Sequence, residues 1–98
     1  YIAFAGIGNP EKFFLSLEKI GIKPIHKIEF PDHHYYSRFD ISRLQKLAKQ
    51  NEAKLITTEK DLIRLPEKFK QEILTLPVDL IFANESKIEN ILEHILVG

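Results

Sequence analysis

The sequence predicts an α/β fold: a mostly parallel sheet of about four strands with helices on both faces, a Rossmann-like three-layer lobe. Two observations predict it. Short apolar runs alternate along the chain with amphipathic stretches of about ten residues, which is the pattern of βαβ units. The first run, residues 2–7, is continuously apolar, as expected of a strand covered on both faces. We therefore expect right-handed crossovers, and functional groups in the loops that follow the carboxyl ends of the strands.

Composition limits the class of protein. The 98 residues suffice for a single domain, residues 1–98. Lys plus Arg and Asp plus Glu both number 14, so the formal net charge is zero and no nucleic-acid partner is expected. The absence of cysteine excludes disulfides and thiolate metal sites. The sequence has no apolar run of membrane-spanning length and no visible signal peptide, so we expect the chain to be soluble. It begins with Tyr1 and not with an initiating Met, so we expect it to be a piece of a longer protein.

The first helix should open at Asn9, a plausible N-cap, with Pro10 in the first helical position, where its missing N–H is harmless. Gly21 suits its C-terminal cap. Residues 24–30 then alternate between apolar and polar, which predicts a strand near the edge of the sheet with one partly wet face. The expected buried stripe of the helix is Phe13, Phe14, Leu17 and Ile20.

A polar, aromatic-rich loop at residues 31–39 precedes the second helix, for which Asp40 is a candidate cap. Residues 54–57 read as the third strand. The second helix should bury Ile41, Leu44, Leu47 and Ala48.

Short helical turns are expected at residues 59–65 and 69–74, and a fourth strand at residues 78–83. The last helix is the clearest of all, because Ser86 and Glu89 have the spacing of a capping box ahead of a regular apolar stripe.

The first strand ends in a glycine-rich turn containing Gly6, Gly8 and Asn9. Glycines between a strand and a helix allow backbone N–H groups to approach a phosphate. However, Glu11 stands where a dinucleotide fingerprint needs its third glycine, and the Walker A pattern is absent from the sequence. The pattern favours a tight structural turn and leaves a ligand contact open.

The densest chemical cluster is Asp32-His33-His34, between two aromatic stretches. It could supply metal ligands or a proton acceptor with an orienting partner. Adjacent residues of an extended segment point to opposite sides, so both histidines are not expected to bind one ion. The alternative is a polar loop in which Asp32 makes an Asx-turn.

A third polar segment, Thr57-Thr58-Glu59-Lys60-Asp61, ends the third strand. Its hydroxyls and charges could hold a polar ligand. The spacing favours a capped helix start instead, with Thr58 as N-cap, Asp61 at the third helical position and Lys60 in solvent.

Taken together, these three segments resemble the C-terminal domain of the lipid A 4'-kinase (tetraacyldisaccharide 4'-kinase) family. Their order and spacing agree with that family from Ala3 to Asp61, and from Phe69 onward only the strand and helix pattern is similar. A match to one such motif would be weak evidence for the family, whereas three matches in the same order and spacing are specific evidence. The matching segments are Ala5-Gly6-Ile7-Gly8-Asn9-Pro10 with Phe13-Phe14 and Leu17, Phe30-Pro31-Asp32-His33-His34 with Tyr36 and Asp40, and Thr57-Thr58-Glu59-Lys60-Asp61.

The resemblance implies a kinase of lipid A (lipopolysaccharide) biosynthesis that uses ATP and Mg²⁺ at the cytoplasmic face of the Gram-negative inner membrane. It would phosphorylate the 4'-hydroxyl of tetraacyldisaccharide 1-phosphate. His33, with Asp32 beside it, would be the catalytic base. A partner carboxylate, the Walker A lysine and the membrane contact would belong to an N-terminal P-loop domain absent from this sequence, so the chain alone should be inactive and hold no metal.

The resemblance also implies which residues lie near substrate or nucleotide. The second lobe would cover an exposed aromatic face for which Tyr35, Tyr36 and Phe39 are candidates. The residues expected near substrate or nucleotide are His34, Tyr36, Gly6, Gly8, Asn9, Thr58, Glu59, Lys60 and Asp61.

Two other functions remain open. A metal-dependent phosphoesterase could use Asp32, His33 and His34, although the first strand ends in glycines where such enzymes carry carboxylates. A receiver-like α/β binding module could use Lys60 at its strand end, but it lacks an acidic pocket after the first strand.

Overall fold

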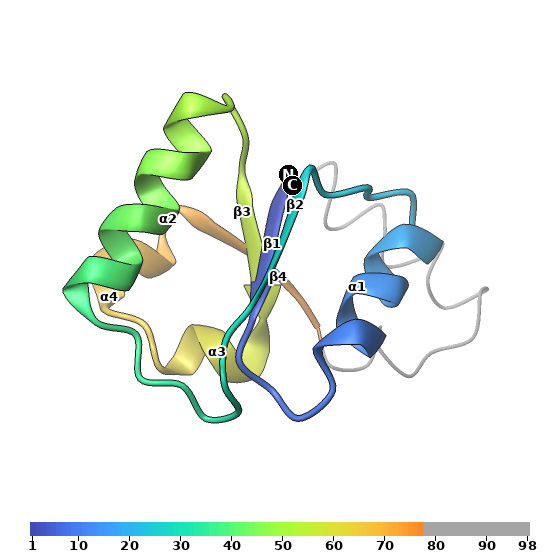
Figure 1. Cartoon of the computed structure of the whole chain (residues 1–98), viewed down its shortest axis with the longest axis horizontal. Coiled ribbons are helices and arrows are strands. Elements are labelled where there is room, and N and C mark those ends of the chain that lie inside the picture. Colours follow the sequence, from blue (N-terminus) through green and yellow to red (C-terminus); the bar gives the residue numbers. More distant parts are fainter. Residues whose placement is uncertain (78–98) are drawn as a thin grey trace.

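Four parallel strands make up the sheet in the computed structural model, which describes residues 1–77 (Figure 1). The strands lie in the order β2-β1-β3-β4, and every pair of neighbours is parallel. This confirms the predicted α/β class. The strands are β1 (Ile2–Ala5), β2 (His26–Glu29), β3 (Leu55–Thr58) and β4 (Ile73–Leu76).

Position in the sheet explains the composition of each strand. β1 lies between β2 and β3, and all four of its residues are buried, as its continuous apolar run predicted. Among the strands of residues 1–77, β2 lies at an edge, and only Ile28 of its four residues is partly buried. The predicted edge strand is therefore confirmed.

Helices cover both faces of the sheet (Figure 1). On one face, α1 (Pro10–Lys19) packs against Ala3 and Ala5 of β1. On the other, Ile2 and Phe4 meet apolar side chains of α2 and α4. The helices of this second face are α2 (Arg38–Gln50), α3 (Glu59–Ile63) and α4 (Glu67–Lys70). Among residues 1–77, no helix combines the length and apolarity that a membrane span requires.

The caps of α1 are those predicted. The side chain of Asn9 accepts a hydrogen bond from the backbone N–H of Lys12 at 3.2 Å, and Pro10 takes the first helical position. Gly21 follows the helix with φ of 87°, a left-handed conformation that glycine adopts without a steric penalty. The expected stripe of Phe13, Phe14, Leu17 and Ile20 is buried.

The prediction that Asp40 is the N-cap of α2 is wrong. Ser37 is the cap: its hydroxyl accepts the backbone N–H of Asp40 at 3.1 Å, and the Asp40 carboxylate accepts the backbone N–H of Ser37 at 3.0 Å. This reciprocal capping box places Asp40 at the third helical position, so the helix begins at Arg38.

The helical turn expected at residues 69–74 is only partly correct. α4 ends at Lys70, and Ile73–Leu76 extends to pair with β3, which buries Ile73 and Leu76. Pairing with a distant strand therefore outweighs the local helical pattern. The strand expected at residues 78–83 and the final helix with its Ser86 cap lie outside the described residues.

Parallel pairing brings three loops together at one edge of the sheet. Ala5 of β1 pairs with Glu29 of β2, and β3 runs beside them in the same direction. Consequently the turn that begins at Gly6, the loop that carries Asp32 to Tyr36, and the start of α3 all meet at the carboxyl edge.

Candidate functional site

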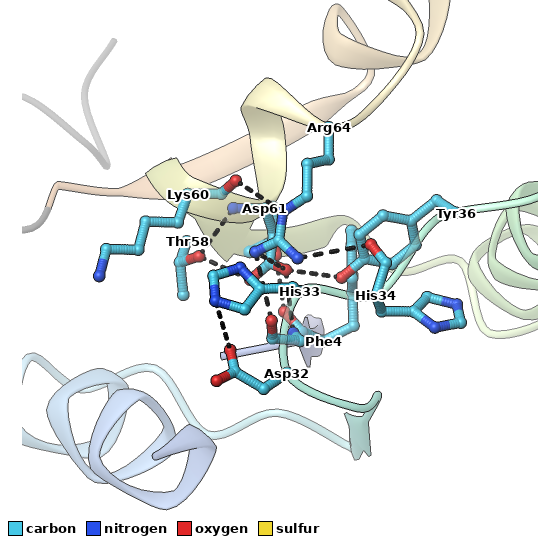
Figure 2. A network of polar contacts seen from close by, with 11 residues as sticks. Phe4, Asp32, His33, His34, Tyr36, Thr58, Lys60, Asp61 and Arg64 are labelled. Carbon is cyan, nitrogen blue, oxygen red and sulfur yellow. Dashed lines mark hydrogen bonds and ion pairs between the residues drawn. The ribbon is translucent and has the colours of Figure 1, made fainter. Parts of the chain in front are cut away.

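A fully buried carboxylate, Asp61, lies at the centre of the carboxyl edge (Figure 2). Its Oδ1 accepts the backbone N–H of Gly6 at 2.9 Å and the hydroxyl of Tyr36 at 2.8 Å. Its Oδ2 accepts the hydroxyl of Thr58 at 2.6 Å. Arg64 completes the group with an ion pair in which Nη2 lies 3.4 Å from Oδ1. We call these five residues the Asp61 cluster.

The cluster depends on a local helix cap. The Thr58 hydroxyl accepts the backbone N–H of Asp61 at 3.1 Å, and the same hydroxyl donates to the Asp61 carboxylate. This is the cap that the spacing of the two residues favoured. Thr58 and Asp61 are both buried, whereas Glu59 and Lys60 between them are exposed.

Gly6 permits the closest backbone approach in the site. A Cβ at this position would lie 2.9 Å from the carbonyl oxygen of Pro31 and 3.1 Å from Cβ of His34. The tight structural turn is therefore confirmed, and the Gly6 N–H is already bonded to Asp61. Gly8 is exposed, and a Cβ there would lie an ordinary 3.5 Å from Oδ2 of Asp32.

Arg64 is the residue that sequence reasoning missed. Its Nη2 donates to the carbonyl of Gly6 at 3.2 Å and its Nη1 to the carbonyl of His34 at 3.4 Å. It thereby neutralises a buried carboxylate and joins two loops. The only signal in the sequence was its position three residues after Asp61 on one short helix.

Tyr36 is buried, which corrects the expectation that it belongs to an exposed aromatic face; Tyr35 and Phe39 are exposed as expected. Burial raises the pKa of the Tyr36 phenol, and so does the hydrogen bond that the phenol donates to Asp61. The phenol therefore stays protonated and remains a donor. Its ring packs edge-on against Phe4 and Phe30, with centroids 5.7 and 5.1 Å away.

The two adjacent histidines have different surroundings (Figure 2). The His33 side chain is 87% exposed, and the 3.9 Å between its Nε2 and Oδ1 of Asp32 is too long for a hydrogen bond. The His34 side chain is 23% exposed and stacks on Phe30 at 4.6 Å. Its Nε2 lies 2.9 Å from Oδ2 of Asp40, and this hydrogen bond holds the pKa of the Asp40 carboxyl below its usual range.

His33 has a left-handed backbone, with φ of 59°, so the segment is not extended as the sequence suggested. The expectation that the two histidines diverge still holds, because Figure 2 shows their rings pointing to different sides. Within residues 1–77, no group of three His, Cys, Asp or Glu side chains is arranged to hold a metal ion.

The structure thus divides the predicted site residues into two sets. Gly6, His34, Tyr36, Thr58 and Asp61 are bonded to one another or to neighbouring structure beneath the surface. Asp32, His33 and Gly8 lie exposed above them, while Asn9 is an exposed cap. Chemically, the exposed set offers one imidazole with a carboxylate beside it, which is suited to accepting a proton from a hydroxyl.

Comparison with known proteins agrees with the resemblance seen in the motifs. A model of the family described as tetraacyldisaccharide-1-P 4'-kinase matches residues 1–97. Curated relatives named tetraacyldisaccharide 4'-kinase include those of Gluconobacter oxydans, 42% identical over 94% of this chain and 28% of the relative, and Hyphomonas neptunium, 43% identical over 96% and 28%. A third, from Paramagnetospirillum magneticum, is 49% identical over 81% of this chain and 24% of the relative. The chain therefore spans well under a third of the length of these relatives, and no solved structure matches it.

Proposed function

The chain belongs to the tetraacyldisaccharide-1-phosphate 4'-kinase family, and from that premise we propose that it is the C-terminal lobe of a longer, ATP-dependent lipid kinase. The reaction is transfer of the γ-phosphoryl group of ATP to the 4'-hydroxyl of tetraacyldisaccharide 1-phosphate, a step of lipid A biosynthesis. The names of the relatives support the reaction, and the 24–28% of their length that this chain spans supports the assignment as one part of the enzyme.

The observation that carries the proposal is the exposed pair Asp32–His33, which we call the outer pair. It stands at the carboxyl edge of a parallel sheet, the place where α/β proteins bind ligands. Its two side chains have no strong hydrogen bond to each other, with 3.9 Å between Nε2 and Oδ1, so the imidazole is available to a substrate.

His33 acts as the general base. As the 4'-oxygen attacks the γ-phosphorus, Nε2 or Nδ1 of the imidazole takes the hydroxyl proton, the new phosphorus–oxygen bond forms, and the bond to the leaving ADP oxygen breaks. The carboxylate of Asp32 stabilises the imidazolium that results. A second carboxylate from the rest of the enzyme completes the base, in keeping with the resemblance.

In this proposal ATP and Mg²⁺ are bound mainly by another part of the enzyme. The described part of this chain has no three-ligand cluster for a metal ion, the sequence has no Walker A motif, and the N–H of Gly6 is already bonded to Asp61. We propose that an N-terminal P-loop domain binds the nucleotide, carries the membrane contact at the cytoplasmic face of the inner membrane, and closes over the outer pair. The chain alone is accordingly inactive.

The alternative functions have less support. A metal-dependent phosphoesterase would need His33 and His34 on one ion, yet His34 is bonded to Asp40 at 2.9 Å and its ring points away from His33 (Figure 2). A receiver-like module would need an acidic pocket after β1, where Gly6 packs against the Pro31 carbonyl instead.

The test is γ-phosphoryl transfer from ATP to tetraacyldisaccharide 1-phosphate by the full-length enzyme. His33→Ala should lower kcat by roughly a hundredfold, the usual contribution of a general base. His26→Ala, an exposed histidine on β2, is the matched control and should retain full activity. Full activity of His33→Ala would mean that the loop is only structural, and turnover by the 98-residue chain alone would overturn the assignment as one lobe.

A further inference from the structure

We propose that Arg64 is a positioning residue for the base: its guanidinium binds the carbonyl of His34 and the carbonyl of Gly6, which itself accepts the backbone N–H of His33, and so sets the direction of the imidazole. The inference rests on the proposed role of His33 and adds a residue from outside the three motifs. Arg64 lies at the C-terminal end of α3, and its side chain is only 24% exposed.

Two of the carbonyls that Arg64 binds are directly linked to His33, one through a hydrogen bond and one through the chain. Gly6 accepts from Nη2 of Arg64 at 3.2 Å, and the same carbonyl accepts the backbone N–H of His33 at 3.0 Å. His34, the next residue, accepts from Nη1 at 3.4 Å. One guanidinium therefore connects the turn after β1 with the residue that follows His33, and one of the two carbonyls that it binds also accepts the His33 N–H.

The guanidinium is itself held in place. Its Nη2 lies 3.4 Å from the buried Oδ1 of Asp61, and its Nε donates to the carbonyl of Lys60 at 3.3 Å. The two terminal nitrogens and Nε thus all have partners, in the planar arrangement that arginine provides and lysine does not.

The conformation of His33 requires such support. Its φ of 59° is unfavourable for a residue with a Cβ, and such conformations persist only where the surrounding structure enforces them. If the backbone around His33 relaxed, the imidazole would move away from the carboxylate of Asp32. Displacements of about 1 Å can cost a reaction as much as a hundredfold in rate.

The experiment is a double-mutant cycle in the full-length enzyme. Arg64→Lys keeps the positive charge beside Asp61 but cannot reach both carbonyls. We expect kcat to fall roughly ten- to a hundredfold with KM for ATP unchanged, because only the position of the base is altered. In the His33→Ala background the same change should have less than about a twofold effect, because there is no longer a base to position.

Two controls separate positioning from general damage. Arg43→Lys alters an exposed arginine of α2 and should leave kcat unchanged. Thermal unfolding of each variant reports loss of fold, and the rates are compared at a temperature at which every variant is folded.

The outcomes are distinct. If the losses from Arg64→Lys and His33→Ala multiply, or if Arg64→Lys retains full kcat, Arg64 does not act through His33 and the inference is wrong while the proposed function stands. If His33→Ala itself retains activity, the proposed function fails first and the inference with it.

Discussion

The loop between β2 and α2 contains two neighbouring histidines with opposite roles in the structure. His34 stacks on Phe30 and bonds to Asp40, next to the Asp61 cluster, where each polar group has a partner. His33 is 87% exposed, and its Nε2 lies 3.9 Å from Oδ1 of Asp32. The inner residues use their hydrogen bonds within the fold, whereas the outer pair leaves its hydrogen-bonding capacity exposed, which is what the proposed role of His33 requires. The following changes test whether stability and chemistry are divided in this way.

The largest effect is expected from Asp61→Ala. It leaves the Gly6 N–H, the Tyr36 hydroxyl and the Arg64 guanidinium without their shared acceptor, and loss of one partner from a buried charged network costs about 3–5 kcal/mol. Urea denaturation of the 98-residue chain measures the change in unfolding free energy. The matched change in the outer pair, Asp32→Ala, should shift it by less than about 0.5 kcal/mol. Equal losses of unfolding free energy for the two variants would show that the inner and outer residues contribute alike to stability.

A smaller loss of stability is expected from Tyr36→Phe, which keeps the packing against Phe4 and removes only the hydroxyl. One buried acceptor then loses a donor, at a cost of about 1–3 kcal/mol. Tyr35→Phe is the control, because Tyr35 is 83% exposed whereas Tyr36 is 3% exposed. The same denaturation experiment should show no more than about 0.5 kcal/mol for Tyr35→Phe, and a larger value would mean that its hydroxyl has a structural role.

His33→Gly should stabilise the chain slightly while abolishing the activity of the full-length enzyme. Glycine relieves the left-handed strain of about 1–2 kcal/mol but loses about 0.5–1 kcal/mol through its more flexible unfolded state, which leaves a gain of up to about 1.5 kcal/mol. Thermal unfolding and phosphoryl transfer, measured on the same variant, check both halves. A destabilised His33→Gly variant would show that the imidazole supports the fold.

The smallest effect concerns the dependence of stability on acid. The hydrogen bond from His34 lowers the pKa of Asp40 in the folded state, so its stabilisation is fully present above the unfolded pKa of about 3.9 and is lost as the pH falls through the lowered folded pKa. The contribution should stay below about 1 kcal/mol for a partly exposed pair. Asp40→Asn should therefore flatten the fall in unfolding free energy below about pH 4; an unchanged slope would show that the pair contributes nothing to acid sensitivity.

The elements predicted correctly from sequence are those whose signals are local. Asn9, Pro10 and Gly21 predicted α1, and Thr58 with Asp61 predicted the start of α3, because caps are made by residues within one turn of each other. The predicted helical turn at residues 69–74 failed where β4 pairs with β3, since that strand is stabilised by a partner strand that precedes α3 and α4 in the chain.

In the candidate site, too, local features were predicted from sequence and contacts between distant residues were not. The motif residues, their loops and the divergence of the two histidines were predicted from sequence, and so was the tight turn at Gly6. The bonds from Asp61 to Gly6 and Tyr36, which join residues 55 and 25 positions apart, were not, and neither was the contact of Arg64 with the carbonyl of Gly6, 58 positions away.

The sequence by itself determined the α/β class, the family and the edge of the sheet where the motif residues meet, because hydrophobic period, caps and motif spacing are properties of neighbouring residues. Only the tertiary structure decided which histidine is exposed and that Arg64 holds the loop. Those outcomes depend on which groups meet after the sheet assembles, and a buried carboxylate bonds to whatever donors the fold brings within about 3 Å.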